Sequence, residues 1–96
     1  MKIFITKKAK KGFDKIRDYI VEDFGELTAR EFDKKVNDFI DLLEVFPELG
    51  SIEVKEKGIR GFVIAKQTKV FYRIKDHKII ILTFFEVRRR PKNKLK

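Results

Sequence analysis

Residues 69–87 read KVFYRIKDHKIIILTFFEV, two runs rich in β-branched and aromatic side chains separated by the dipeptide Asp76-His77. Such runs are typical of β-strands, and a two-residue connection is typical of an antiparallel hairpin. The second run is apolar at nearly every position, which favours a central strand covered on both faces. This stretch predicts the middle of an antiparallel sheet, with strands over residues 69–75 and 78–87.

Two further strand candidates precede this hairpin. Residues 59–66 form another run rich in Ile, Val and Phe after Gly58, and Ile52 and Val54 alternate with charged residues shortly before it. Because the segments are closely spaced, we expect them to form an antiparallel meander. The dipeptide Gln67-Thr68 is taken as the two-residue loop between residues 59–66 and 69–75.

The first half of the chain carries helical periodicity. A short apolar segment over residues 3–5 suits a buried strand, and Thr6 can cap the helix that follows. Apolar residues then recur at three- and four-residue spacing from Ala9 to Phe24, which places them on one helical face. Gly25 is well placed to end this helix.

A second helix is predicted immediately afterwards. Thr28 and Glu31 fit a Thr-x-x-Glu capping box at its start, and a second apolar stripe continues from Phe32 to Phe46. Pro47 ends the pattern because its nitrogen cannot donate a backbone hydrogen bond. Two adjacent amphipathic helices with a short connection should form an antiparallel hairpin.

The order of elements predicts an α+β fold, with a short N-terminal strand, an antiparallel two-helix hairpin and a C-terminal antiparallel meander sheet. The helices would cover one face of the sheet. The 96 residues contain no repeat and no low-complexity linker, so we expect a single domain over residues 1–96.

Composition excludes several functional classes. The chain has no Cys and one His, which leaves no disulfide framework, cysteine nucleophile or multi-histidine metal site. Its five Gly are isolated, so it has no Gly-rich phosphate loop. We expect no metal, no cofactor and no small-molecule substrate. No apolar run approaches the length of a membrane helix or a signal peptide, and we expect a cytoplasmic protein without a membrane partner.

Charge is distributed unevenly along the chain. The formal net charge of +9 divides into +5 for residues 1–21, −7 for residues 22–56 and +11 for residues 57–96. The basic excess in the strands and in the C-terminal stretch favours an anionic partner, either phosphates or an acidic protein segment.

The assumed loops fix the face of the sheet on which each side chain lies. One face would be small and aliphatic and would meet the helices, with Val63, Val70, Tyr72, Ile79 and Ile81 among its members. The other would mix cations with aromatic rings: Arg60, Arg73, Lys75 and Arg88 with Phe62, Phe71 and Phe84. Such a face can hold a phosphate backbone while rings stack on bases, or it can form a protein docking groove. The alternative is a second small core whose Arg heads reach water.

Several segments together carry a resemblance to a known family. They are the helix exit Phe46-Pro47-Glu48-Leu49-Gly50, Gly58-Ile59-Arg60, Val70-Phe71-Tyr72-Arg73, Ile79-Ile80-Ile81-Leu82 and Arg88-Arg89-Arg90-Pro91. In this order they resemble the RelE/ParE superfamily of bacterial type II toxins. The resemblance implies a growth inhibitor that is neutralised by a cognate antitoxin, and it implies one of two targets. Some members cleave messenger RNA in the ribosome, and others inhibit DNA gyrase without cleaving anything.

The residues favour the gyrase branch over the ribosome-dependent endonuclease. For a nuclease, the resemblance points to Arg60, Lys69 and Arg88 or Arg89 as phosphate-binding groups, with Glu86 as the candidate base. Nuclease members commonly place a His or Tyr after the last strand, and this chain has neither there. We therefore predict a toxin that acts by binding, rather than an enzyme, through a set of basic residues: Arg60, Arg73, Lys75, Arg88, Arg89 and Arg90. A basic nucleic-acid-binding module without toxicity is a further alternative.

Overall fold

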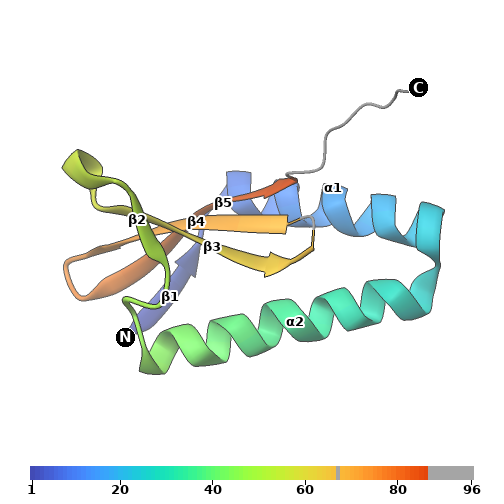
Figure 1. The fold of residues 1–96 in the computed structure, drawn as a ribbon, viewed down its shortest axis with the longest axis horizontal. Coiled ribbons are helices and arrows are strands. Elements are labelled where there is room, and N and C mark those ends of the chain that lie inside the picture. The colour runs from blue at the N-terminus through green and yellow to red at the C-terminus, as the bar shows by residue number, and fades with distance from the viewer. Residues whose placement is uncertain (67, 87–96) are drawn as a thin grey trace.

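A computed structural model describes residues 1–66 and 68–86. The elements, in order, are β1 (Lys2–Ile5), α1 (Lys7–Phe24), α2 (Glu26–Val45), β2 (Ser51–Val54), the 3-10 turn η1 (Lys55–Lys57), β3 (Ile59–Ala65), β4 (Thr68–Lys75) and β5 (Lys78–Glu86). Figure 1 shows the two helices as a hairpin beside one twisted sheet. The predicted α+β class and order of elements are confirmed.

The five strands form a mixed sheet in the order β1-β5-β4-β3-β2. Neighbours from β2 to β5 are antiparallel, as the predicted meander requires, whereas β1 pairs with β5 in parallel. The prediction of a buried strand over residues 3–5 is wrong. Within the residues that the structure describes, β1 lies at the edge of the sheet, and Phe4 and Ile5 keep 45% and 50% of their surface exposed.

α1 begins and ends where the sequence predicts. The Thr6 hydroxyl accepts a hydrogen bond from the Ala9 amide at 3.0 Å, which caps the first turn. Gly25, with a φ of +92°, ends α1 and at once precedes α2. The predicted capping box is wrong, because this one-residue reversal starts α2 at Glu26. Thr28 then lies inside α2, and its hydroxyl donates to the Phe24 carbonyl.

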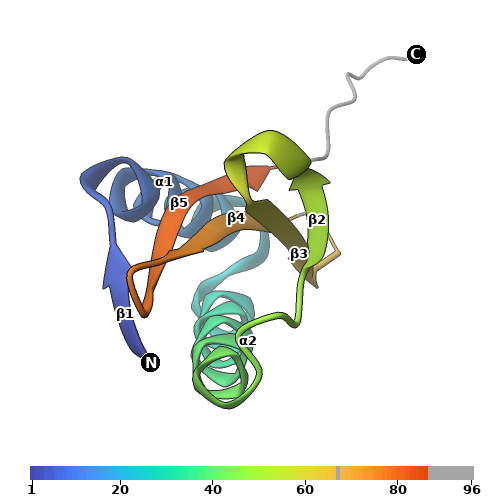
Figure 2. The ribbon, with the colours of Figure 1, turned by 90° about the vertical axis from the view of Figure 1, so that its left-hand side faces the viewer.

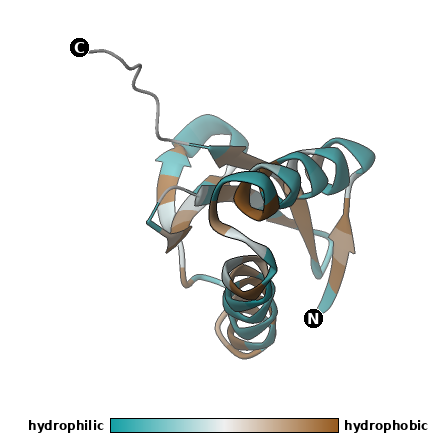
Figure 3. Ribbon diagram, turned by 90° about the vertical axis from the view of Figure 1, so that its right-hand side faces the viewer, coloured by the Kyte–Doolittle hydropathy of each residue, from teal (hydrophilic) through white to brown (hydrophobic). Residues whose placement is uncertain are grey.

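One hydrophobic core lies between the helices and the sheet. Figure 2 shows α2 crossing below the sheet and α1 running beside β5, and Figure 3 shows hydrophobic and hydrophilic segments alternating along both helices. The buried core residues come from both helices and from the two central strands: Ala9, Ile16, Phe32, Val36, Phe39, Leu43, Val70, Tyr72, Ile79, Ile81 and Phe84.

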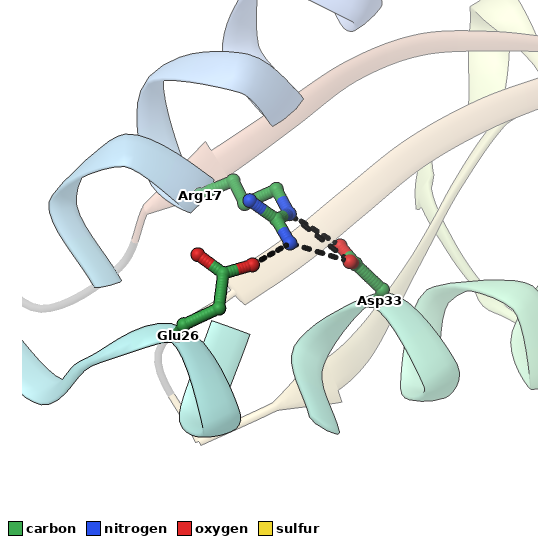
Figure 4. A network of polar contacts seen from close by, with 3 residues as sticks. All are labelled: Arg17, Glu26 and Asp33. Carbon is green, nitrogen blue, oxygen red and sulfur yellow. Dashed lines mark hydrogen bonds and ion pairs between the residues drawn. The ribbon is translucent and has the colours of Figure 1, made fainter. Parts of the chain in front are cut away.

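An ion network joins α1 to α2 near their connection. Arg17 of α1 donates to both carboxylate oxygens of Asp33 at 2.8–3.0 Å and to Glu26 at 3.0 Å. Figure 4 shows the guanidinium held between the two carboxylates of α2. The hydrogen bonds with Asp33 first, and then with Glu26, raise the pKa of Arg17 above its ordinary value.

The connection between β3 and β4 differs from the predicted one. Ala65 pairs with Thr68, so Thr68 is a buried strand residue and not part of the loop. This shift exchanges the two faces of β3, because successive side chains point to opposite sides of a strand. Phe62, predicted to face away from the helices, instead stacks on Phe39 of α2 at 4.9 Å between ring centroids. Val63 is exposed, contrary to prediction.

A bulge in β5 explains why Phe84, which was predicted to face away from the helices, lies on the helix-facing side. Asp76 and His77 form the predicted two-residue turn, both with positive φ, and Tyr72 pairs with Ile81 in the predicted register. The pairing then shifts, since Phe71 lies opposite Thr83 and Val70 opposite Phe84. Phe84 is therefore buried on the helix-facing side, where its ring contacts Phe13 at a centroid distance of 5.8 Å.

Candidate functional site

The face of the sheet turned away from the core, called the outer face below, is the candidate site. The ion pair of Glu53 with Lys69 places Glu53 on it, and the observed register assigns to it Lys2, Phe4, Ser51, Ile59, Gly61, Val63, Lys69, Phe71, Arg73, Lys75, Lys78, Ile80, Thr83 and Phe85. Of these side chains, only Glu53 is acidic, whereas five are cationic. The outer face therefore has the basic and aromatic character predicted from sequence, with a partly different membership.

Phe71, Arg73 and Lys75 share the outer face, as predicted. Phe71 meets Phe85 edge to face at 6.5 Å between ring centroids, and the Nζ of Lys69 lies 5.3 Å from the centre of the Phe71 ring. Phe85 is 51% exposed and takes the position predicted for Phe84. The rings can therefore stack on a partner, while Arg73 and Lys75 supply charge on the same strand.

Lys69 is held by an acidic partner. Its Nζ lies 2.9 Å from Oε2 of Glu53, and both side chains are about one-quarter to one-third exposed, at 25% and 32%. The bridge passes over Gly61 of β3, where a Cβ would lie 2.9 Å from Glu53 and from Lys69. Gly61 thus leaves the space that lets a β2 carboxylate reach a β4 lysine.

Arg60 lies on the other side of the sheet and has a structural role. It pairs with Tyr72, and its Nη1 donates to the Gly50 carbonyl at 2.7 Å and to the Glu48 carbonyl at 3.3 Å. The predicted grouping of Arg60 with Arg73 and Lys75 on one face is wrong, because the β3 register is shifted. Arg60 fastens the segment that follows α2.

Glu86 is also separated from Lys69. It pairs with Thr68 on the helix-facing side and lines a cleft of about 300 Å³ between the two helices and the ends of β3, β4 and β5. The cleft is mainly apolar, with Ile20, Phe24 and Phe32 in its walls. The bulge in β5 places Glu86 there, since it reverses the face of every residue that follows.

Arg88, Arg89 and Arg90 lie outside the described residues. In the ranges 1–66 and 68–86, no group of three His, Cys, Asp or Glu side chains could hold a metal ion. No helix in those ranges is both long enough and apolar enough to cross a membrane.

Sequence reasoning did not place several members on the outer face, among them Lys2, Phe4, Lys78 and Phe85. Phe85 was missed because an apolar run such as that of β5 gives no sign of a bulge. Lys2 and Phe4 join the face through the parallel pairing of β1 with β5. The signal available in the sequence was the set of basic residues at strand ends, Lys2, Lys75 and Lys78.

Comparison with solved structures identifies the class of protein to which this fold belongs. The chain has the fold of RelE/ParE-type toxins. It is similar to a chain of the chromosomal ParDE toxin–antitoxin system from P. aeruginosa, with a TM-score of 0.76 and 22% identity, covering 92% of this chain and 97% of that one. It is also similar to a copper-bound mutant toxin from Helicobacter pylori, with a TM-score of 0.64 and 23% identity, covering 90% and 93%.

A third similar structure is the YoeB-YefM complex from Staphylococcus aureus, with a TM-score of 0.58 and 16% identity over 88% of this chain and 93% of that one. No curated protein matches the sequence. A family model described as the ParE toxin of the type II toxin-antitoxin system, parDE, matches residues 3–91. The chain belongs to this ParE toxin family.

Proposed function

We propose that this ParE toxin arrests growth by binding DNA gyrase through the outer face, and that it is not an RNA endonuclease. Arg73 and Lys75 of β4 supply cationic contacts in this proposal, and Phe71 and Phe85 supply apolar ones. Arg88, Arg89 and Arg90 continue the same basic character along the sequence. Binding of this kind needs no proton-transfer group.

The observation that carries the proposal is the dispersal of the described nuclease candidates. Phosphoryl transfer to an RNA 2′-hydroxyl needs cations and a base around one phosphate. Arg60 is bound to two backbone carbonyls, Lys69 is bridged to Glu53 on the outer face, and Glu86 lines the cleft on the opposite side. These three groups do not converge on one reacting atom.

A cognate antitoxin is the proposed regulatory partner. The family description places such toxins in toxin–antitoxin pairs, and the net charge of +9 favours an acidic antitoxin segment. Co-expression of the toxin with the product of an adjacent gene, followed by purification through a tag on that product, tests the pairing. Recovery of the untagged toxin with that product, and not with an unrelated protein that carries the same tag, is the expected result.

The decisive test combines two assays on purified toxin. We expect inhibition of gyrase supercoiling and intact messenger RNA in a translating extract. Glu86→Gln should inhibit gyrase as the wild type does, because Glu86 lies on the side of the sheet opposite the binding face. Arg73→Ala should weaken inhibition, and Lys34→Ala on the exposed surface of α2 serves as the matched loss of one cation.

Cleavage of messenger RNA that disappears in Lys69→Ala or Glu86→Gln would replace the proposal with the endonuclease. Harmless expression of folded protein that leaves supercoiling unchanged would support the basic nucleic-acid-binding module instead. The supercoiling and messenger RNA assays use the same purified protein, with its fold checked by circular dichroism.

A further inference from the structure

Three lysines form a row across the outer face. The register places Lys2 of β1 opposite Lys78 of β5, and Lys78 opposite Lys75 of β4. Because adjacent strands lie about 4.8 Å apart, this lysine row extends over roughly 10 Å at the end of the sheet that holds the β4–β5 turn. All three side chains are exposed.

The lysine row is unfavourable for the isolated sheet. Like charges placed directly opposite on neighbouring strands destabilise a sheet. Among residues 1–66 and 68–86, none of the three lysines forms an ion pair. Lys78 does contact a ring, with its Nζ 5.5 Å from the centre of Phe4. An arrangement of residues that lowers stability, with no evident compensating contact within the protein, is expected at a functional surface.

A polyanion would remove this repulsion. A strand of duplex DNA carries one negative charge per roughly 3.4 Å of helix axis, so its linear charge density is high. An extended acidic peptide presents carboxylates on one side only at every second residue, or about 6.6 Å. The next row of the sheet adds the Phe4 ring and Arg73, on either side of Ile80, and these groups can pack against sugar or base.

We propose that the lysine row binds the phosphodiester backbone of DNA. This inference goes beyond the proposed function, because the contact requires no gyrase. It also differs from the nuclease candidates, since Lys69 lies at the opposite end of β4 and is bridged to Glu53.

The test uses the purified full chain and two fluorescent probes, a DNA duplex and a single-stranded DNA of equal length. Binding of about three phosphates predicts that duplex affinity falls roughly 40-fold between 50 mM and 200 mM salt. Lys78→Glu should weaken binding by about tenfold or more. The same variant should raise the melting temperature, because it replaces two like-charge pairs with two opposite-charge pairs.

Lys11→Glu is the matched control. Lys11 is exposed on α1 and lies four residues from both Lys7 and Lys15, so the substitution makes the same change in charge and also relieves two like-charge pairs. We expect it to weaken DNA binding by less than about threefold. The single-stranded probe shows whether the row prefers a duplex or merely any phosphodiester chain.

Equal losses of affinity in Lys78→Glu and Lys11→Glu would overturn the proposal in favour of a general charge effect. Tighter binding of polyglutamate than of DNA would assign the row to an acidic protein segment. Because gyrase is absent from this assay, DNA binding through the row can succeed when supercoiling inhibition fails, and the reverse is equally visible.

Discussion

Tyr72 ties the central strand to the segment that follows α2. Its buried hydroxyl accepts a hydrogen bond from the Gly50 amide and donates one to the Pro47 carbonyl, both at 2.8 Å. Arg60 donates to the Gly50 carbonyl beside it. One phenol therefore pairs two backbone groups, the buried Gly50 amide and the partly buried Pro47 carbonyl.

Removal of this hydroxyl should cost stability. Tyr72→Phe keeps the ring but leaves the Gly50 amide and the Pro47 carbonyl unpaired, and we expect a loss of about 1–3 kcal/mol in the free energy of unfolding. Urea denaturation measures this difference. An unchanged midpoint and slope would contradict the assigned hydrogen bonds.

Tyr72 should also make stability depend on pH in the alkaline range. Burial raises the pKa of its hydroxyl above the ordinary value of 10.0, against the lowering effects of the Gly50 amide and the Arg60 charge. The folded state thus favours the neutral phenol. Its contribution is complete below about pH 10 and is lost as the pH rises through the raised pKa. The stability difference between wild type and Tyr72→Phe should therefore shrink above pH 10, as measured by urea unfolding at several pH values.

Between α1 and β5, close packing depends on Gly12. A Cβ at this position would lie 2.8 Å from the carbonyl oxygen of Phe84, an atom of the β5 backbone. In an exposed helix, Gly→Ala would gain about 1 kcal/mol. Here we expect Gly12→Ala to destabilise the protein by about 1–3 kcal/mol, because the strand cannot yield locally. Thermal unfolding beside Asp14→Ala, an exposed position of the same helix, checks the sign.

The ion network of Arg17 also stabilises the connection between α1 and α2. Arg17→Lys keeps the charge but loses the planar fork that reaches Asp33 and Glu26 together. We expect a lower melting temperature, with the difference from wild type shrinking as salt is added. Lys34→Ala breaks an exposed pair with Asp38 and should leave the melting temperature unchanged.

At the level of elements, the sequence predicts the type and order of the helices and strands well, and the pairing register of the strands less well. The caps at Thr6 and Gly25 and the Asp76-His77 turn are local features, and the structure confirms them. The face of Phe62 depends on which residues form a loop, and that of Phe84 depends on a bulge. β3 and β5 carry apolar residues on both of their faces. The hydrophobic pattern therefore does not distinguish the buried face from the exposed one, and it could not fix the register of these strands.

At the scale of the whole molecule, the uneven distribution of charge along the sequence predicted a basic surface, and the outer face is basic. Phe71, Arg73 and Lys75, which were predicted to share this face, come from β4. The register of β4 with β5 was predicted correctly next to the Asp76-His77 turn. The remaining members of the outer face required knowledge of β1, because no local signal shows that the first strand lies beside the last. Long-range pairing is decided by the packing of the complete domain.

That pairing makes the protein late to assemble. β1 is synthesised first, yet the strand that pairs with it among residues 1–66 and 68–86 is β5, which lies 76 residues further along the chain at Lys2 and Lys78. During translation the early helices can form, whereas the sheet edge and the lysine row cannot exist until β5 has emerged. A nascent chain that does not yet include β5 therefore lacks this surface.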